Sequence, residues 1–534
     1  MDVVFRGATV YDGSGAPGQP LDVAVRDERI VALGEPGRVS ASQVIDATGL
    51  ALAPGFIDMH SHADHTLPAF PAAPNSISQG VTTEVVGLCG FSPAPVSAEP
   101  SRAEQLRDLA RGVGPDLDWR WSDFASFLDR FDAARPSTNV APLVGHAALR
   151  IAAMGMEARA SSETELAVMR AELRAALDAG AWGMSTGLVY APGAFAELRE
   201  LYSLGEELRL ADAMYVSHIR NEGEGLFEAV DEALTIGQQH GIRSQVSHLK
   251  ASGRRNFGKV KGALGIIRGH RARGERAHCD VYPYTAGSTF LHQVLPPWVK
   301  EGGLQRMVER LNVPESRQRV RHDIEHGLPG WFNHLEAAGG WHNVLLTSVA
   351  TASRRSAEGR RVADLAAAER VDPLDYVLDL LIADHGATVM VIFLMAEEDV
   401  RDALSAPFAA IGSDLLGVTS ASARVHPRAY GTFVRVLGWG VREAQLFPLE
   451  EAIRKMTGLP ASILGLRDRG LVSVGAIADL VLFDPLRVTD NATYDEPTRL
   501  ASGVEYVLIG GELAVESGRL VKLDGGRVLR RQIP

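Results

Sequence analysis

The sequence predicts an α/β fold, a (β/α)8 TIM barrel with a metal site, joined to a small β-sandwich domain and a helical insertion. Between residues 53 and 465, short apolar runs alternate with helical stretches, a pattern typical of a parallel sheet covered by helices. About eight such units are present, which favours a closed barrel. Both ends of the chain instead carry strand-like runs punctuated by glycine, which predict a separate β-domain.

The β-domain is predicted from residues 1–52 together with residues 466–534. Its candidate strands are rich in Val, Ile and Leu, and they include "DVVFRGATVYD", "LDVAVRDERIVALG", "GAIADLVLFDP" and "GVEYVLIGGELAVE". Because the two ends of a domain often lie close together, both segments can belong to one β-sandwich.

The barrel is predicted in two parts, residues 53–285 and 344–465. Its candidate strands are "GFIDMHS", "VTTEVVGLCG", "NVAPLVGHA", "AWGMSTGL", "MYVSHIR", "RSQVSHL", "RAHCDVYPY" and "PFAAIGSD". Two intervening segments, "SETELAVMRAELRAALDAG" and "GEGLFEAVDEALTIGQQHG", end in glycine, as helices commonly do. Residues 286–343 interrupt this alternation, and we expect them to form a helical insertion or lid.

Composition and charge exclude several classes of protein. The content of hydrophobic residues (46%) and charged residues (22%) is ordinary for a globular protein, and the net charge of -12 argues against a nucleic-acid partner. The N-terminus lacks a basic segment followed by an apolar core, and the most apolar run, "VMVIFLM", is too short to cross a bilayer. Two cysteines make no disulfide framework. These features predict a cytoplasmic protein without a membrane partner, and they leave the oligomeric state open.

Two histidines stand at the end of the first candidate strand, in "GFIDMHSHADH". In a strand, His60 and His62 point to the same face because side chains alternate with period 2. Two imidazoles on one face suit a divalent metal better than an apolar core. A polar strand end that enters a loop is the alternative, since a short motif needs its structural context.

Four further metal-binding side chains end other candidate strands: Cys89, His218, His248 and Asp414. Taken singly, the cysteine could be a small buried hydrophobe, each histidine an ordinary hydrogen-bonded residue, and the aspartate a cap. Those readings do not explain why all four lie where barrel active sites are built, at the carboxyl ends of strands. Imidazole, thiolate and carboxylate are the ligands of zinc, so the sequence predicts a zinc site.

The motifs resemble the amidohydrolase superfamily and, within it, the N-acyl-D-amino-acid deacylases (D-aminoacylases). The resemblance is carried by "PGFIDMHSHAD", "GVTTEVVGLCGFSPAP", "GLVYAPGAFAE", "SHIRNEG", "VSHLK", "DVYPYTAGST" and "GSD...HPR". It extends over nearly the whole chain. It implies a metal-bearing barrel, a β-domain made from both termini, and a mobile insertion after the seventh strand.

The resemblance also implies two metal sites, with His65 outside the main ligand set. The tighter zinc site would comprise Cys89, His218 and His248, and the weaker site His60, His62 and Asp414. Hydantoinases and dihydroorotases of the same superfamily usually bridge two metals with a carboxylated lysine at the fourth strand. In this chain that strand is "AWGMSTGL", and the first lysine in the sequence is Lys250. A carboxylated bridge at that strand is therefore excluded, and the thiolate of Cys89 supplies the charge.

The predicted reaction is hydrolysis of an N-acyl-D-amino acid to a carboxylate and a free D-amino acid. Zinc lowers the pKa of bound water toward about 7, which makes hydroxide available at neutral pH. Asp414 is expected to take a proton from this water as general base and to return it to the leaving amine as general acid.

Several residues are candidates for holding the substrate. Lys250 lies in "VSHLK", two residues beyond a predicted ligand, and Arg428 lies in "VHPRAYGTF", where a guanidinium can bind a carboxylate bidentately. The resemblance implies that a lysine, a tyrosine and this arginine bind the substrate's α-carboxylate. The tyrosine is Tyr282 or Tyr284, of which we favour Tyr282, and Ser288 is a further candidate. An ordinary surface charge is the alternative for Lys250.

One stretch departs from typical D-aminoacylases. The segment "LLGVTSASARV" after Asp414 is longer and less rich in histidine, adds Arg424, and is expected to line the side-chain pocket. The preferred side chain and the preference for D over L substrates therefore stay open. The same machinery could act on an N-acyl-L-lysine, a dipeptide, a cyclic amide or a carbamoyl compound. A non-catalytic barrel scaffold is a third reading, which the complete set of candidate ligands disfavours.

Overall fold

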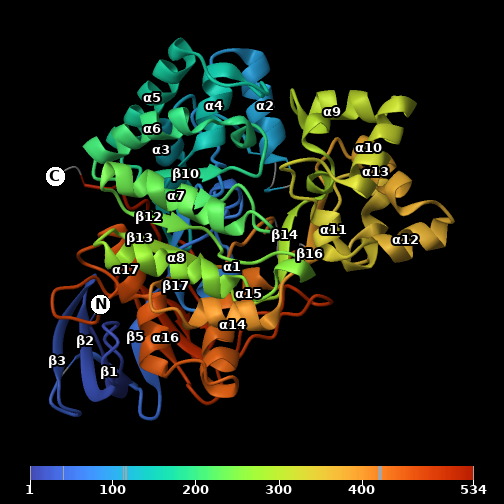
Figure 1. Ribbon diagram of the computed structural model, residues 1–534. Helices are drawn as coiled ribbons and strands as arrows, with labels where there is room; N and C mark the ends of the chain where they lie inside the picture. Colours follow the sequence, from blue (N-terminus) through green and yellow to red (C-terminus); the bar gives the residue numbers. More distant parts are fainter. Residues whose placement is uncertain (1, 40, 112, 115–116, 419–423, 533–534) are drawn as a thin grey trace.

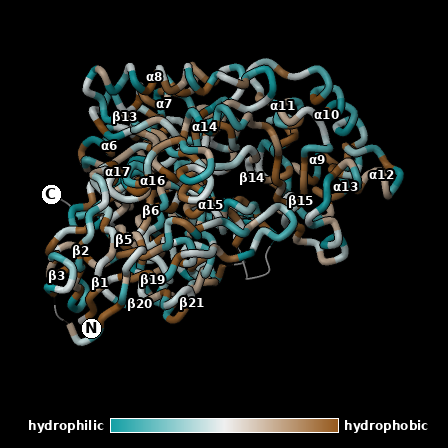
Figure 2. Tube along the Cα trace, turned by 90° about the horizontal axis from the view of Figure 1, so that it is seen from below, coloured by the Kyte–Doolittle hydropathy of each residue, from teal (hydrophilic) through white to brown (hydrophobic). Residues whose placement is uncertain are grey.

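The protein has a central barrel, with a β-sheet domain on one side and an inserted lobe on the other (Figure 1). The computed structural model describes residues 2–39, 41–111, 113–114, 117–418 and 424–532. Figures 1 and 2 both place the inserted lobe, with helices α9 to α13, at the end of the molecule opposite strands β1 to β3. None of the helices in the described ranges is long and apolar enough to cross a membrane.

Parallel strands form the barrel, and they pair in the order in which they occur along the chain. They are β6 (Phe56–Asp58), β7 (Val81–Val86), β8 (Asn139–Pro142) with β9 (Val144–Gly145), β10 (Gly183–Gly187), β11 (Met214–His218), β12 (Ser244–Val246), β13 (Ala277–Val281) and β17 (Ala409–Ile411). Only Leu143 separates β8 from β9, so the two continue one another. The amide of Met59 donates to the carbonyl of Ile411 at 3.1 Å, which joins β17 back to β6. The described strands thus close a circle, and the predicted barrel is confirmed.

Helices cover the outside of this barrel. They include α3 (Phe124–Ala134), α4 (His146–Met154), α5 (Glu163–Asp178), α6 (Leu198–Leu210), α7 (Leu226–His240), α8 (Val260–Ala272), α14 (Glu397–Ser405), α15 (Arg428–Arg435), α16 (Leu449–Met456) and α17 (Gly458–Leu464). A capping box between Ser162 and Glu165 starts α5. Gly241, with φ of 62°, ends α7 in the left-handed conformation that glycine adopts at little cost. Both helices therefore form where the sequence predicts them.

Strands from both ends of the chain form one hydrogen-bonded sheet of nine strands, in the order β21-β20-β19-β18-β5-β1-β2-β3, with β4 beside β1. Their bounds are β1 (Asp2–Val10), β2 (Gln19–Arg26), β3 (Arg29–Gly34), β4 (Gln43–Asp46), β5 (Ala51–Pro54), β18 (Leu480–Phe483), β19 (Val504–Ile509), β20 (Glu512–Glu516) and β21 (Arg519–Leu520). Antiparallel pairing of β5 with β18 joins the two ends. Phe5, Val23, Ile30, Leu480 and Leu508 are buried together in this domain.

The inserted lobe differs from the predicted helical insertion at residues 286–343. It contains an antiparallel sheet of three strands, β14 (Ala286–Phe290), β15 (Val344–Ser348) and β16 (Val389–Phe393), in the order β14-β16-β15. Its helices are α9 (Leu304–Leu311), α10 (Pro314–His326), α11 (His334–Ala338), α12 (Val362–Glu369) and α13 (Pro373–Ala383). Strand β16 pairs with β14 across about a hundred residues of chain, and local patterns carry no signal for such a pairing. The other predicted domain boundaries stay predictions.

Candidate metal centre

The six predicted ligands come together at the carboxyl edge of the barrel. His60 and His62 follow β6, Cys89 follows β7, His218 ends β11, His248 follows β12, and Asp414 follows β17. All six side chains are buried. Because the carboxyl ends of parallel barrel strands meet at one face, residues that are up to 354 positions apart share one site.

Three of these residues adopt a backbone conformation that is uncommon outside glycine. Cys89, His248 and Asp414 have positive φ angles of 52°, 34° and 51°. Such conformations cost roughly 1–3 kcal/mol each and occur mainly at functional sites. Each lies two or three residues beyond the end of a strand, at the carboxyl edge of the barrel.

One group of ligand atoms comprises Cys89, His218 and His248. The Sγ of Cys89 lies 3.5 Å from Nε2 of His248, and Nδ1 of His218 lies 2.9 Å from the same Nε2. Zinc bound tetrahedrally at about 2.0–2.3 Å holds its ligand atoms at similar separations from one another. These three residues can therefore bind a zinc ion and leave a fourth position open.

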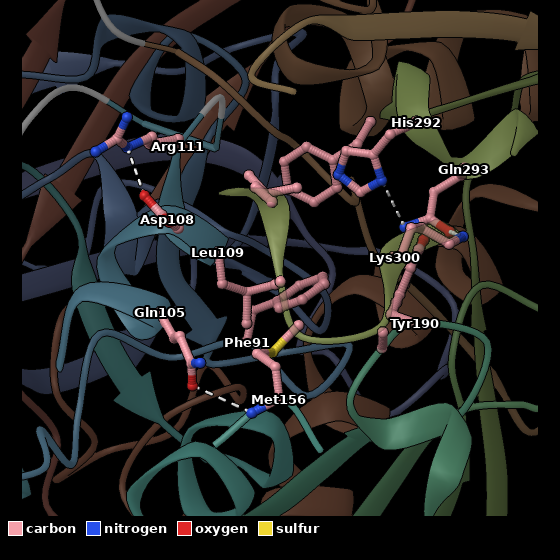
Figure 3. Close-up of a pocket in the computed structure, with 14 residues that line it drawn as sticks. Phe91, Gln105, Asp108, Leu109, Arg111, Met156, Tyr190, His292, Gln293 and Lys300 are labelled. Atoms are coloured by element: carbon pink, nitrogen blue, oxygen red, sulfur yellow. Dashed lines mark hydrogen bonds and ion pairs between the residues drawn. The ribbon is translucent and has the colours of Figure 1, made fainter. Parts of the chain in front are cut away.

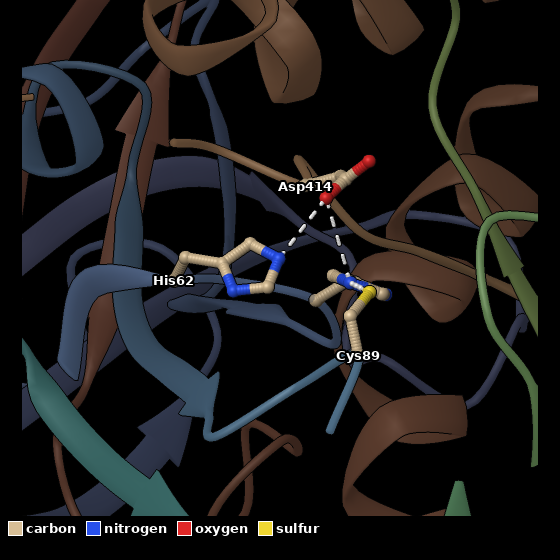
Figure 4. A group of neighbouring side chains, drawn as sticks. His62, Cys89 and Asp414 are labelled. Atoms are coloured by element: carbon tan, nitrogen blue, oxygen red, sulfur yellow. Dashed lines mark hydrogen bonds and ion pairs between the residues drawn. The ribbon is translucent and has the colours of Figure 1, made fainter. Parts of the chain in front are cut away.

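A second group comprises His60, His62, Cys89 and Asp414 (Figure 4). Nε2 of His60 lies 3.2 Å from Sγ of Cys89 and 3.5 Å from Oδ1 of Asp414. Nε2 of His62 lies 3.4 Å from the same Oδ1. Cys89 belongs to both groups, so its sulfur stands where a ligand shared by two ions would lie.

Two of the predicted ligands, Cys89 and Asp414, are held in their charged forms. Burial alone would raise the pKa of the Cys89 thiol, but His60, His248 and His218 hold that pKa well below its usual value. Burial would likewise raise the pKa of Asp414, but Arg428 and His60 hold it well below the usual range. Both groups are therefore anions at neutral pH, the form in which a thiol and a carboxyl group bind a metal.

Asp280, on β13, orients His60 from inside the barrel. Its Oδ1 lies 3.1 Å from Nδ1 of His60 and accepts the backbone amide of His248 at 2.8 Å. Its Oδ2 accepts from Gln245 Nε2 at 2.6 Å. A carboxylate behind a ligand histidine fixes the ring so that its other nitrogen faces the metal. Sequence reasoning missed this residue, although it begins the quoted motif "DVYPYTAGST".

Glu222 lies behind the other two histidines and was also missed. Its Oε1 lies 3.3 Å from Nδ1 of His248, 3.6 Å from Nε2 of His218, and accepts from Lys250 Nζ at 2.7 Å. Burial would raise the pKa of Glu222, but Lys250 and His218 hold it well below its usual range. The residue lies in the quoted motif "SHIRNEG", but its link to His248 depends on the fold.

Glu222→Gln is expected to weaken zinc binding about 10- to 100-fold, the usual effect of losing such an orienting carboxylate. The amide keeps the shape of the side chain but removes the charge that both histidines and Lys250 face. Zinc affinity is measured by competition with a chelator. Glu224→Gln, an exposed position in the same loop, serves as the control. Equal zinc affinity in the two variants would contradict an orienting role for Glu222.

A cavity opens in front of the metal-binding groups. Three predicted substrate contacts, Lys250, Tyr282 and Ser288, line it. Tyr284 is not in its lining and packs against His426 instead, with ring centroids 5.2 Å apart. Tyr190, which sequence analysis did not single out, also lines the cavity, and its hydroxyl lies 3.2 Å from Oγ1 of Thr289.

Arg428 and the segment after Asp414 lie differently from the expectation. Arg428 is 1% exposed, is absent from the cavity lining, and places Nη1 2.8 Å from Oδ2 of Asp414. Its guanidinium also lies over the ring of Tyr282, 4.7 Å from the centroid. Residues 419–423 of the predicted side-chain loop lie outside the described residues, and Arg424 is exposed. Within that loop, Leu416 lines the cavity.

The sequence pattern of the Amidohydro_3 amidohydrolase family matches residues 43–226 and 322–515 of this chain, which is more than half of its length. This chain belongs to that amidohydrolase family. It is 38% identical to the N-acyl-D-glutamate deacylase of Alcaligenes xylosoxydans xylosoxydans, over 99% of this chain and 97% of the relative. It is 35% identical to the D-aminoacylase of the same organism, over 99% and 98% of the two chains. The resemblance inferred from the motifs is confirmed.

The fold of this amidohydrolase family member matches a solved structure of a similar enzyme. The N-acyl-D-glutamate deacylase of Bordetella bronchiseptica, solved with zinc and a phosphonate inhibitor that mimics the tetrahedral intermediate, superposes with a TM-score of 0.82. The two chains are 36% identical, and the match covers 99% of each. Similarity at this level extends through the barrel, the β-domain and the inserted lobe.

Proposed function

We propose that this amidohydrolase is a zinc-dependent deacylase that hydrolyses N-acyl-D-amino acids to a carboxylate and a free D-amino acid. The observation that carries the proposal is the pair of metal-binding groups joined by Cys89, which open into the same cavity as Lys250. The relatives named D-aminoacylase and N-acyl-D-glutamate deacylase support this substrate class.

In the proposed reaction, Cys89, His218 and His248 hold the tighter zinc, and His60, His62 and Asp414 hold a weaker second ion with Cys89 shared. Zinc supplies a more acidic water and a polarised amide carbonyl when bound. Asp414 is ionised at neutral pH and lies between His60 and His62, so its carboxylate can accept the proton of the attacking water. The same carboxyl group then donates that proton to the leaving amine nitrogen.

Substrate orientation depends on charge at the wall of the cavity. Lys250 has three ammonium donors, one of which goes to Oε1 of Glu222 at 2.7 Å. We propose that the remaining donors and the hydroxyl of Tyr282 bind the α-carboxylate. Arg428 contributes from behind, through its contacts with the Tyr282 ring and with Asp414.

We further propose a cytoplasmic location and a small-molecule substrate as the partner. Cys89 and Cys279 are both free and buried, in keeping with a reducing compartment. The net charge of -12 gives the chain no overall electrostatic attraction to nucleic acid.

Amine release from paired N-acetyl-D- and N-acetyl-L-amino acids by the zinc-loaded protein tests the function. Acidic, basic and apolar side chains are included in both series. We expect turnover to be confined to the D forms. Turnover confined to the L forms, or cleavage of cyclic amides alone, would reject the deacylase assignment while keeping a metal hydrolase.

A further inference from the structure

A second cavity lies directly beside the metal cavity (Figure 3). The two cavities share three aromatic residues, Phe91, Tyr190 and Phe290. Leu109 and Met156 add further apolar wall to the second cavity. A group that extends past these aromatic rings from the metal cavity therefore enters a mostly apolar space.

One side of this second cavity carries a buried cation, Lys300, which ends the short helix η5 (Pro297–Lys300). Its side chain is 6% exposed. Its Nζ donates to a neutral group, Oε1 of Gln293 at 2.7 Å, and no carboxylate of the described residues lies within 4.0 Å. Burial lowers the pKa of Lys300 to about 7. A buried ammonium without an anion is costly, so this position favours an anionic ligand.

Lys250 and Lys300 are both buried, but they differ in whether a carboxylate lies beside them. Lys250 is equally buried, but it has the carboxylate of Glu222 at 2.7 Å. Lysine is also rare in this chain, with six occurrences among 54 basic residues. Lys300 therefore differs from Lys250, because no carboxylate among the described residues forms an ion pair with it.

Polar side chains lie beside Lys300 on the same side of the second cavity. Nδ1 of His292 lies 3.4 Å from Nε2 of Gln293, and the His292 ring stacks on Phe290 at 5.1 Å. Burial and the nearby Lys300 lower the pKa of His292 to about 3, so the ring is neutral. Figure 3 shows His292, Gln293 and Lys300 grouped on one side, while Asp108 and Arg111 pair with each other on the other side.

The path from this group to the metal site is short. The ring of Phe91 lies 6.2 Å from that of His62 and 6.0 Å from that of Phe290. His334, which lines the metal cavity, has its pKa lowered to about 3 by burial and by Lys300. Lys300 therefore acts electrostatically on the wall of the metal cavity as well as on its own.

We propose that the Lys300 cavity is the side-chain subsite of this deacylase and that it takes D-amino-acid side chains that end in a carboxylate. The inference rests on the proposed function and narrows its substrate class. The side-chain carboxylate gives Lys300 its missing anion in a charge-assisted hydrogen bond. The methylene groups of the side chain then pack against Phe91, Leu109 and Phe290.

The test compares N-acetyl-D-glutamate with N-acetyl-D-glutamine, which has the same shape but no charge. The wild-type protein is expected to prefer glutamate in kcat/KM. Lys300→Met should lower kcat/KM for glutamate about 10- to 100-fold, and should leave glutamine within about threefold, because only the charged contact is lost. Lys300→Arg should restore part of the glutamate preference, and Lys261→Met, an exposed lysine on α8, should change neither substrate.

Three outcomes would overturn the subsite: equal loss on both substrates in Lys300→Met, no preference for glutamate in the wild type, or a glutamate preference that survives Lys300→Met. Binding of both compounds to zinc-loaded wild-type protein, measured by calorimetry, separates this inference from the proposed function. If no N-acetyl-D-amino acid of the wider panel is cleaved, the deacylase assignment fails. If N-acetyl-D-glutamate binds more tightly than N-acetyl-D-glutamine and this difference depends on Lys300, the anion subsite is still supported. If the two compounds bind equally well, the anion subsite is rejected.

Discussion

Asp414→Asn is expected to lower kcat about 10²- to 10⁴-fold, the usual contribution of a general acid–base group, while zinc stays bound at Cys89, His218 and His248. The amide cannot accept the proton of the attacking water or return it to the leaving amine. Zinc content by mass spectrometry and kcat for the best N-acetyl-D-amino acid are measured on the same preparation. Zinc retained with turnover lost is the expected result.

The control for this variant must separate chemistry from folding. Asp414 lies 2.8 Å from the buried Arg428, and removing one partner of a buried ion pair can destabilise a protein by about 3–5 kcal/mol. Thermal unfolding is therefore measured alongside, and Asp129→Asn, at a position 79% exposed, is the matched surface change. A folded Asp414→Asn protein that keeps more than a tenth of wild-type kcat would place the general base elsewhere.

Cys89→Ser is expected to lose both tightly bound zinc and nearly all activity. Cys89 belongs to both metal-binding groups, and neighbouring histidines hold its thiol as a thiolate. A serine hydroxyl is nearly isosteric but stays protonated at neutral pH, so it cannot supply the negative charge shared between two ions. Zinc stoichiometry after dialysis and amine release are the two measurements.

Cys279→Ser provides a control in the same chain. Cys279 is also free and buried, but it belongs to neither metal-binding group, and burial raises the pKa of its thiol to about 12. We expect this variant to keep its zinc and its turnover. Full zinc content in Cys89→Ser would show that the histidines and Asp414 suffice, and the assignment of Cys89 as the shared ligand would be wrong.

The barrel was predictable because its strands and helices carry strong local patterns. Each predicted strand segment contains a barrel strand, as for β7 within "VTTEVVGLCG" and β11 within "MYVSHIR". Strands buried on both faces need near-continuous apolar runs, and α5 and α7 carry their own start and stop signals. The sheet in the inserted lobe was not predicted, since β14 and β16 pair across a long, mostly helical segment.

By itself, the sequence determined which candidate metal ligands stand at the strand ends. Local periodicity places strand ends, and the common edge of a parallel barrel brings them together. Only the tertiary structure decided the roles of Asp280 and Glu222 behind the histidines, the pairing of Arg428 with Asp414, and the burial of Lys300 without a carboxylate. Charges and hydrogen bonds act through space over a few ångströms, and the distance between two side chains on different strands is set by the fold.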